Sequence, residues 1–158
     1  MSRAFVNEDS FIDELPDRPI SEHPNLVTAR GLALIEQALE TARREYGEAQ
    51  HAAERESLSR AGRDLRYWSA RRATAQLRAP QPGADVVQFG HAVTIMRNDG
   101  RQQTFRIVGE DEADIRNGRL SVTSPLARAL IGKGKGDSVE VSTPRGNKSY
   151  EVVTVAFS

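Results

Sequence analysis

Residues 105–153 read FRIVGEDEADIRNGRLSVTSPLARALIGKGKGDSVEVSTPRGNKSYEVV, and this stretch decides the fold class of the C-terminal half. Short runs rich in Val, Ile and Thr, such as TFRIVG, SVEVST and YEVVTVAF, alternate with turn residues and predict β-strands. SPLARALIG (124–132) predicts a helix, because Ser124 suits an N-cap, Pro125 suits the first helical position and a glycine follows. The pattern predicts a small antiparallel β domain with one short helix over residues 86–158.

Residues that favour tight turns lie between the predicted strands of this half. Further strands are predicted at VVQFG, HAVTIM and LSVTS. Asn98–Gly100 and the stretch 144–147 are typical of hairpin turns. The stretch KGKGD (133–137) resembles a phosphate-binding loop only superficially, because it lacks the GK[ST] ending and does not open a helix. We interpret it as one more hairpin turn.

Residues 25–78 lack proline and are rich in good helix formers. Thr28 suits an N-cap, and an apolar stripe at spacings of three and four follows it, formed by Leu32, Ile35, Leu39 and Ala42. Ser and Gly weaken the helical pattern near residues 57–62. The region predicts two helices of about 30 and about 15 residues, packed as an antiparallel coiled-coil hairpin, with Leu65, Trp68 and Leu77 on the second stripe.

Two further segments complete an α+β organisation. Residues 79–85 read APQPGAD and are typical of a linker. Residues 1–24 are rich in Asp and Glu and contain three prolines, so we expect an acidic, mostly extended arm. This arm is either a loose tail or a segment that packs through Phe5, Val6, Phe11, Ile12 and Leu15; the loose tail is favoured.

Composition narrows the possible functions. The chain has 158 residues, with 22 Lys and Arg against 22 Asp and Glu, so net charge gives no argument for general attraction to DNA or membranes. It has no cysteine, which excludes a disulfide framework, a thiolate nucleophile and a cysteine zinc site. No apolar run reaches the roughly 20 residues of a membrane span, and the N-terminus does not resemble a secretory signal. A cytoplasmic protein is expected.

Signals for catalysis are few. The three histidines are isolated in the sequence, and their spacing does not suggest metal ligation. The acidic run EDEAD (110–114) is either a cation site, a docking patch for a basic partner or a solvated loop, and the solvated loop is favoured.

The most unusual stretch is SLSRAGRDLRYWSARR (57–72), which carries five arginines. It falls at the predicted turn of the hairpin and therefore at its tip. Arginines together with Tyr67 and Trp68 could pair with phosphates and stack on bases. Trp68, three residues after Leu65, also fits the apolar stripe, and we favour a place for it in the hairpin core.

The C-terminal half resembles the C-terminal domain of the Gre transcription elongation factors. The resemblance rests on IVGEDEAD, SVTSPLARALIGK and GD-x-VEV-x-TP-x-G, and it covers most of residues 86–157. Val27-Thr-Ala-Arg-Gly31 is similar to the family's opening motif, and Tyr67 with Ala70-Arg71 is similar to the start of its second helix. The resemblance implies an FKBP-like C-terminal domain preceded by a coiled-coil hairpin.

The resemblance also implies a partner. Such a factor binds bacterial RNA polymerase at the rim of the secondary channel, sends its coiled coil toward the active site and modulates elongation or initiation. It is an accessory factor and not an enzyme, it binds no cofactor alone and acts near the polymerase's Mg²⁺, and a monomer is expected. The residues matched to the polymerase-docking segment are Thr123, Ser124, Pro125, Leu126 and Arg128.

The chain departs from the family at the tip. Family members that promote transcript cleavage carry a pair of acids there, which helps to hold the second catalytic Mg²⁺. Aligned on Tyr67 these acids fall on Arg60 and Arg63, and aligned on the opening motif they fall on Gly62 and Leu65. Arginine stays protonated and cannot coordinate a cation. We therefore hypothesise a factor that does not stimulate cleavage.

In this hypothesis the tip residues Arg60, Arg63, Asp64 and Arg66 contact phosphates of the nascent RNA, the incoming nucleotide or the polymerase's catalytic carboxylates. One alternative keeps cleavage and metal binding through Asp64, paired with Glu54 or Glu56 from the facing helix. A second alternative is an FKBP-like interaction module for a partner other than polymerase, such as a metabolic kinase. The first alternative differs from the main hypothesis because it predicts transcript cleavage. The second differs because it predicts no binding to polymerase.

Overall fold

The computed structural model describes residues 15–83 and 85–157. It divides into a helical unit, in which residues 15–24 accompany Leu32–Ala75, and a β unit formed by Asn25–Gly31 with the residues from Gln76 onward. The helices are α2 (Ala29–Ala52), α3 (Arg55–Thr74) and α4 (Pro125–Leu130), with a short 3₁₀ turn η1 (Ile115–Asn117). The strands are β1 (Leu26–Val27), β2 (Gln76–Leu77), β3 (Ala92–Arg97), β4 (Gln102–Val108), β5 (Arg119–Ser121), β6 (Ser138–Thr143) and β7 (Gly146–Ala156).

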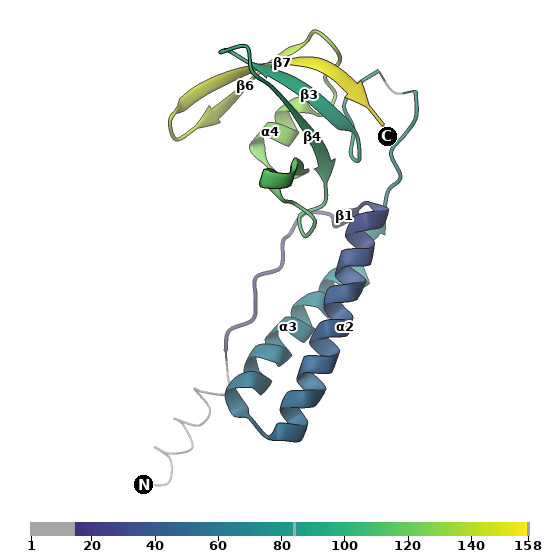
Figure 1. Cartoon of the computed structure of the whole chain (residues 1–158), viewed down its shortest axis with the longest axis vertical. Coiled ribbons are helices and arrows are strands. Elements are labelled where there is room, and N and C mark those ends of the chain that lie inside the picture. The colour runs from purple at the N-terminus through teal and green to yellow at the C-terminus, as the bar shows by residue number, and fades with distance from the viewer. Residues whose placement is uncertain (1–14, 84, 158) are drawn as a thin grey trace. The chain divides into compact units, whose positions relative to one another are not determined.

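The helical unit is an antiparallel hairpin of α2 and α3 (Figure 1). Thr28 caps α2 as predicted, since its hydroxyl accepts a hydrogen bond of 3.0 Å from the Gly31 amide. The predicted stripe of α2 is also confirmed, with Leu32 half-buried at its start. Its buried members are Ile35, Leu39 and Ala42, and buried Ala49 extends the same stripe further along the helix.

The turn of the hairpin lies earlier in the chain than predicted. Ala53 and Glu54 connect the helices, and Ala53 adopts a left-handed backbone conformation with φ 55°. The expected break at residues 57–62 is wrong, because those residues lie inside α3. Gly62 faces the other helix, where a Cβ would come within 3.3 Å of the Tyr46 ring. Close packing against Tyr46 therefore outweighs the weak helix propensity of glycine.

This shift changes the helix lengths and the second stripe. The helices have 24 and 20 residues instead of about 30 and about 15. Leu77, predicted on the second stripe, lies in β2 and is 57% exposed. The arm is extended along α3 over its described residues 15–24 (Figure 1), where it makes side-chain contacts and is not a loose tail. Phe5, Val6, Phe11 and Ile12 lie outside the described residues.

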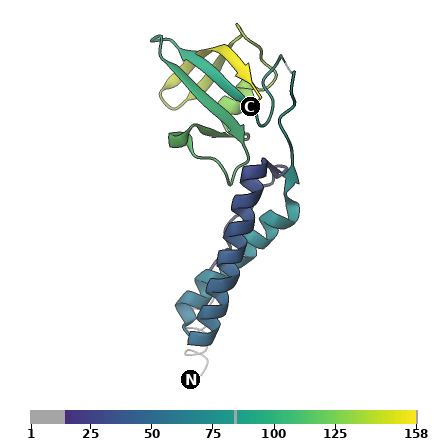
Figure 2. The same ribbon diagram turned by 45° about the vertical axis from the view of Figure 1, so that its right-hand side comes forward.

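The β unit is built on a five-stranded sheet in the order β5-β4-β3-β7-β6. Neighbouring strands are antiparallel except β4 and β5, which are parallel. Between these two strands the chain runs back through η1 and its flanking loops, so that β5 begins beside Arg106 of β4. The sheet curls around α4 (Figures 1 and 2). The core that they share is formed by Val87, Val93, Ile95, Phe105, Ile107, Leu120, Ala127, Leu130, Val139 and Val152.

Most predicted connections of this unit are confirmed. Asn98–Gly100 joins β3 to β4, and Pro144-Arg145 joins β6 to β7. The interpretation of residues 133–137 as a hairpin turn is wrong, because they connect α4 to β6. The predicted strand VVQFG is also absent, since Val86 makes only an isolated bridge to Gly134. A single bridge does not make a ladder, so residues 86–90 are not part of a strand.

One small sheet of the β unit had no counterpart in the sequence predictions. β1 and β2 pair in parallel, with Leu26 beside Gln76 and Val27 beside Leu77. Gly109 follows β4 directly and approaches β1 so closely that a Cβ would lie 2.3 Å from the Leu26 carbonyl oxygen. Glycine is therefore required where the main sheet approaches β1.

Candidate functional site

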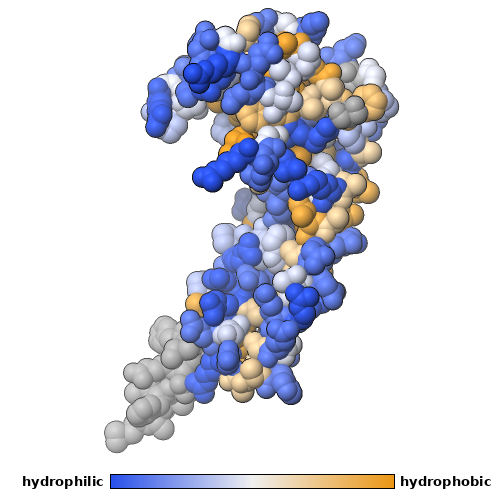
Figure 3. Space-filling model, in the orientation of Figure 1, coloured by the Kyte–Doolittle hydropathy of each residue, from blue (hydrophilic) through white to orange (hydrophobic). Residues whose placement is uncertain are grey.

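The candidate site is the α3 side of the hairpin, which carries the five arginines of residues 57–72. Counted from Glu54, Arg60 lies about 9 Å and Arg63 about 13 Å along the helix, at ~1.5 Å per residue. These residues were expected at the tip, and the structure places them in the second and third turns of α3 instead. The face of the hairpin seen in Figure 3 is mostly hydrophilic. The contacts proposed for these arginines remain predictions.

The five arginines differ in availability. Arg71 is 2% exposed, and Arg72 pairs with Glu36 at 3.3 Å. Arg63 is half-buried, and its Nε is buried without a hydrogen-bond partner. Arg66 pairs with Asp17 at 2.7 Å, whereas Arg60 is exposed. Arg60, Arg66 and Arg72 are therefore the exposed members of the stretch, and the last two are ion-paired.

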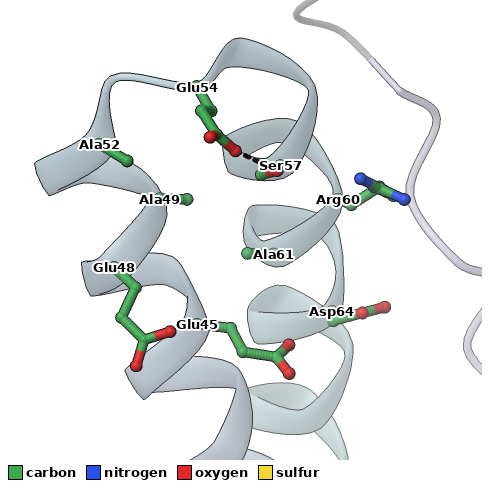
Figure 4. A pocket seen from close by; sticks show the side chains of 9 residues that line it. All are labelled: Glu45, Glu48, Ala49, Ala52, Glu54, Ser57, Arg60, Ala61 and Asp64. Atoms are coloured by element: carbon green, nitrogen blue, oxygen red, sulfur yellow. Dashed lines mark hydrogen bonds between the residues drawn. The ribbon is translucent and has the colours of Figure 1, made fainter.

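A groove lies between α2 and α3 next to the turn (Figure 4). It measures ≈ 480 Å³, and its shape follows from the alanines at 49, 52 and 61, whose short side chains cannot fill the space between the helices. Polar side chains surround this apolar floor. They are Glu45, Glu48, Glu54, Ser57, Arg60 and Asp64.

The acidic residues named for a displaced metal site do not come together. Glu54, Glu56 and Asp64 all precede or lie on α3, so none faces another from the opposite helix. Glu54 and Asp64 are about 15 Å apart along the helix axis, whereas two oxygens on one Mg²⁺ lie roughly 4 Å apart or less. Within residues 15–83 and 85–157, no group of three or more His, Asp or Glu side chains is arranged to hold a metal. The described residues therefore do not fit the proposed cation site.

The arm is bound to α3 by polar contacts. The Leu15 amide donates to the Ser59 hydroxyl at 3.4 Å. Asp17 accepts from Arg66 Nε at 2.7 Å, and Arg18 donates through Nη1 to Asp64 at 3.1 Å. Asp64 is thereby neutralised by a residue of the same chain.

Arg18 also covers the aromatic pair of α3. Its guanidinium carbon lies 3.9 Å from the Tyr67 ring centroid and 5.5 Å from that of Trp68. The two rings meet edge to face with their centroids 4.9 Å apart. Trp68 is half-buried, so its place in the hairpin core stays a prediction. A cation over an exposed ring contributes about 0.5–1 kcal/mol and an exposed ion pair about 0.2–1 kcal/mol, so water and salt weaken the arm's attachment.

The acidic run 110–114 has a structural role that the sequence analysis missed. The Glu112 side chain is 3% exposed, and its carboxylate accepts from the Thr28 hydroxyl and from Arg30 Nη1, the latter at 3.2 Å. Gly31 leaves room for it, since a Cβ there would lie 2.8 Å from Glu112 Oε1. Glu112 is thus neither a solvated loop residue nor a cation ligand. It joins the opening motif at Thr28 to the loop that follows β4.

Replacing Glu112 with alanine is expected to lower the free energy of unfolding by about 2–3 kcal/mol, because the change leaves polar partners of a buried carboxylate without a hydrogen bond. Urea denaturation followed by circular dichroism measures this effect. Glu140→Ala, at an exposed position of β6, is the matched control and should change stability by less than roughly 0.5 kcal/mol. Equal effects of the two variants would contradict the structural role of Glu112.

The segment matched to a docking site lies at the start of α4. Ser124 caps the helix as predicted, accepting from the Ala127 amide at 3.3 Å and donating to the Ser121 carbonyl at 2.7 Å. Thr123 donates to Glu110 at 3.3 Å. Pro125 and Arg128 are exposed, whereas Leu126 packs against the core. The segment therefore presents Pro125 and Arg128 outward on a capped, rigid support, and its binding role remains a prediction.

Comparison with known proteins defines the class. Residues 81–157 match the family model described as the C-terminal domain of the transcription elongation factors GreA/GreB. Transcription elongation factor GreA of Cereibacter sphaeroides is 44% identical over 119 residues, which cover 72% of this chain and 76% of that protein. The class is therefore that of the proteins named transcription elongation factors GreA/GreB. The chain belongs to the GreA/GreB family.

Other relatives match over a shorter stretch. Transcription elongation factor GreA of Methylobacterium nodulans is 60% identical over 73 residues, which are 46% of this chain and 46% of that protein. The chain thus spans about half the length of several curated relatives that it matches. The solved structure of GreA factor homolog 1 of Thermus thermophilus covers 84% of this chain and 99% of its own, at 22% identity and a TM-score of 0.41, a similarity too low to support any argument. No described helix is long and apolar enough to cross a membrane.

Proposed function

We propose that the protein binds bacterial RNA polymerase at its secondary channel and modulates elongation or initiation without stimulating transcript cleavage. Family membership supports polymerase as the partner. The proposed lack of transcript cleavage rests on one observation. Asp64, the acid next to the aligned positions 60 and 63, is paired with Arg18 at 3.1 Å. A carboxylate that is already neutralised by a guanidinium is a poor ligand for Mg²⁺, and the aligned arginines repel a cation.

The proposed binding to RNA polymerase rests on the segment at the start of α4. Thr123, Ser124 and Pro125 form a rigid corner, and Arg128 extends from the exposed side of the helix. A cation on a fixed helix suits an acidic or carbonyl-rich partner surface. Arg60, exposed beside the groove, is the residue that we propose for contacts with nascent RNA phosphates, the incoming nucleotide or polymerase carboxylates. The protein acts as a monomer in this proposal.

Arg128→Glu is expected to weaken binding to purified core polymerase by roughly 10-fold or more, because the change places an anion where the partner accepts a cation. Fluorescence anisotropy of the labelled protein, titrated with core polymerase, measures the dissociation constant. Arg101→Glu is the matched control, because Arg101 is a 79% exposed side chain in the turn after β3. If both variants bind like the wild type, α4 is not the docking segment; if the wild type does not bind at all, the proposed partner is wrong.

A further inference from the structure

The groove between α2 and α3 beside the turn carries an excess of negative charge. Its lining residues include four carboxylates against one cation, Arg60. In Figure 4 the Arg60 guanidinium and the Asp64 carboxylate point away from the groove, whereas Glu45 extends from α2 toward α3. Within the part of the chain that the structure describes, the side chains of Glu45 and Glu48 form no hydrogen bond or ion pair. The chain therefore leaves these two carboxylates of the groove without a counter-charge.

The floor of the groove is apolar, and the groove is narrow. Ala49 and Ala61 are each 6% exposed, and Ala52 continues the floor toward the turn. The volume of ≈ 480 Å³ lies within the range of small-ligand sites. Spread over the roughly 15 Å of helix axis between residues 54 and 64, it is only about 6 Å across, whereas a helix with its side chains measures about 10–12 Å. A slender ligand fits this space better than a helix of a partner protein.

The carboxylates are spread along the groove. Glu54 lies at the turn, and Glu45 lies seven residues before Ala52, ~10 Å along α2. This spread prevents the carboxylates from sharing a metal ion, but it suits a chain that carries several cations at intervals. In a linear polyamine, ammonium groups alternate with short methylene segments. The ammonium groups can pair with the carboxylates while the methylenes lie on the alanines, as the stem of a lysine side chain lies on an apolar surface.

Charge also argues against the occupants that the chain itself could supply. Residues 1–14 contain four acidic residues against Arg3, and the same groove of a second copy would be equally acidic, so the carboxylates would repel both. We propose that the groove is a binding site for a linear polyamine, whose ammonium groups pair with Glu45, Glu48 and Glu54. The Glu54 carboxylate already accepts from the Ser57 hydroxyl at 3.0 Å through Oε2, and its other oxygen is the acceptor for the ligand.

The test is isothermal titration calorimetry of the full chain with spermidine at low salt. We expect one molecule to bind per chain, about 10-fold or more tightly than Mg²⁺ at equal ionic strength, because one metal ion cannot contact the separated carboxylates together. In ¹⁵N NMR spectra of the full chain, spermidine should shift the backbone amide signals of Ala49, Ala52 and Ala61.

Three variants locate the site. Glu45→Gln combined with Glu48→Gln should weaken spermidine binding by about 10-fold, because two charge-assisted hydrogen bonds lose their charge. Glu40→Gln is the matched control, at an exposed position of α2 outside the groove, and should leave the affinity unchanged. Ala52→Leu fills the apolar floor at an exposed position and should abolish binding.

Several results would overturn the proposal. If Mg²⁺ binds as tightly as spermidine, if Glu40→Gln weakens binding as much as the groove variant, or if Ala52→Leu leaves binding intact, the spermidine contacts a diffuse acidic surface and not the groove. Tighter binding of a lysine-rich peptide than of spermidine would identify a protein partner and overturn the choice of ligand. All these measurements use the chain without polymerase, so their failure is distinguishable from a failure of the proposed function.

Discussion

In a backtracked RNA polymerase elongation complex, the protein is expected to leave the rate of transcript cleavage within roughly 2-fold of the rate without any factor. Each tenfold acceleration requires about 1.4 kcal/mol of additional transition-state stabilisation, which a cleavage factor supplies by holding a metal ion with carboxylates. Here Asp64 is paired with Arg18 at 3.1 Å, and Glu54 accepts a hydrogen bond of 3.0 Å from Ser57. The measurement is the shortening of 3′-extended, radiolabelled RNA in the purified complex.

Three variants make this prediction specific. Asp64→Asn and Glu54→Gln remove the acids that belong to the competing cleavage hypothesis, and both should behave like the wild type. Arg60→Asp with Arg63→Glu places acids at the positions that the alignment on Tyr67 gives to the family's pair, and it should gain cleavage if those positions reach the polymerase metals. Stimulated cleavage by the wild type, lost in Asp64→Asn or Glu54→Gln, would falsify the proposal and identify a cleavage factor.

Gly109→Ala is expected to be the most destabilising of the single small substitutions in the β unit. The new Cβ would lie 2.3 Å from the Leu26 carbonyl oxygen, and that neighbour is backbone in a paired strand and cannot rotate away. Either β1 or the loop after β4 must move, at a cost of about 3 kcal/mol. We expect the melting temperature to fall by about 5–10 °C, measured by circular dichroism.

The matched control for Gly109 is another glycine, Gly47. It lies on the exposed side of α2, and a Cβ there would meet nothing within 4 Å. Gly47→Ala should raise stability by about 0.5–1 kcal/mol, because glycine is a poor residue in a helix interior. If the two substitutions change the melting temperature in the same direction, the close approach of Gly109 to β1 does not explain the effect.

The C-terminal unit could be predicted well because its signals are local. Ser124 and Pro125 define the start of α4 within two residues, and the turns at Asn98–Gly100 and at residues 144–147 occupy the stretches where hairpins form. Alternating apolar residues then place β3, β4, β6 and β7. The parallel pairing of β5 and the two-residue strands β1 and β2 had no such signal, because short strands depend on which partner the fold provides.

The candidate site was less predictable because its features depend on distant partners. Gly62 indicated a helix break by propensity, but it is an interhelical contact with Tyr46, and the turn moved to Ala53 and Glu54. The contacts of Arg18 with Asp64 cross 46 residues of sequence, and that of Glu112 with Thr28 crosses 84. Complementary charges were visible in the arm and in α3, but composition alone does not assign pairs among many exposed charges.

The sequence by itself determined the family, the helical hairpin, the capped α4 and the presence of five arginines and one acid in residues 57–72, because these follow from residue identity at fixed spacing. Only the tertiary structure decided that these arginines lie inside α3 and not in the turn, that Asp64 is neutralised by Arg18, and that Glu112 is buried beneath Thr28. The reason is that each of these features depends on which helix, strand or arm packs against the residue. Packing between distant segments sets burial and charge pairing, and those in turn set which arginines and carboxylates a partner can reach.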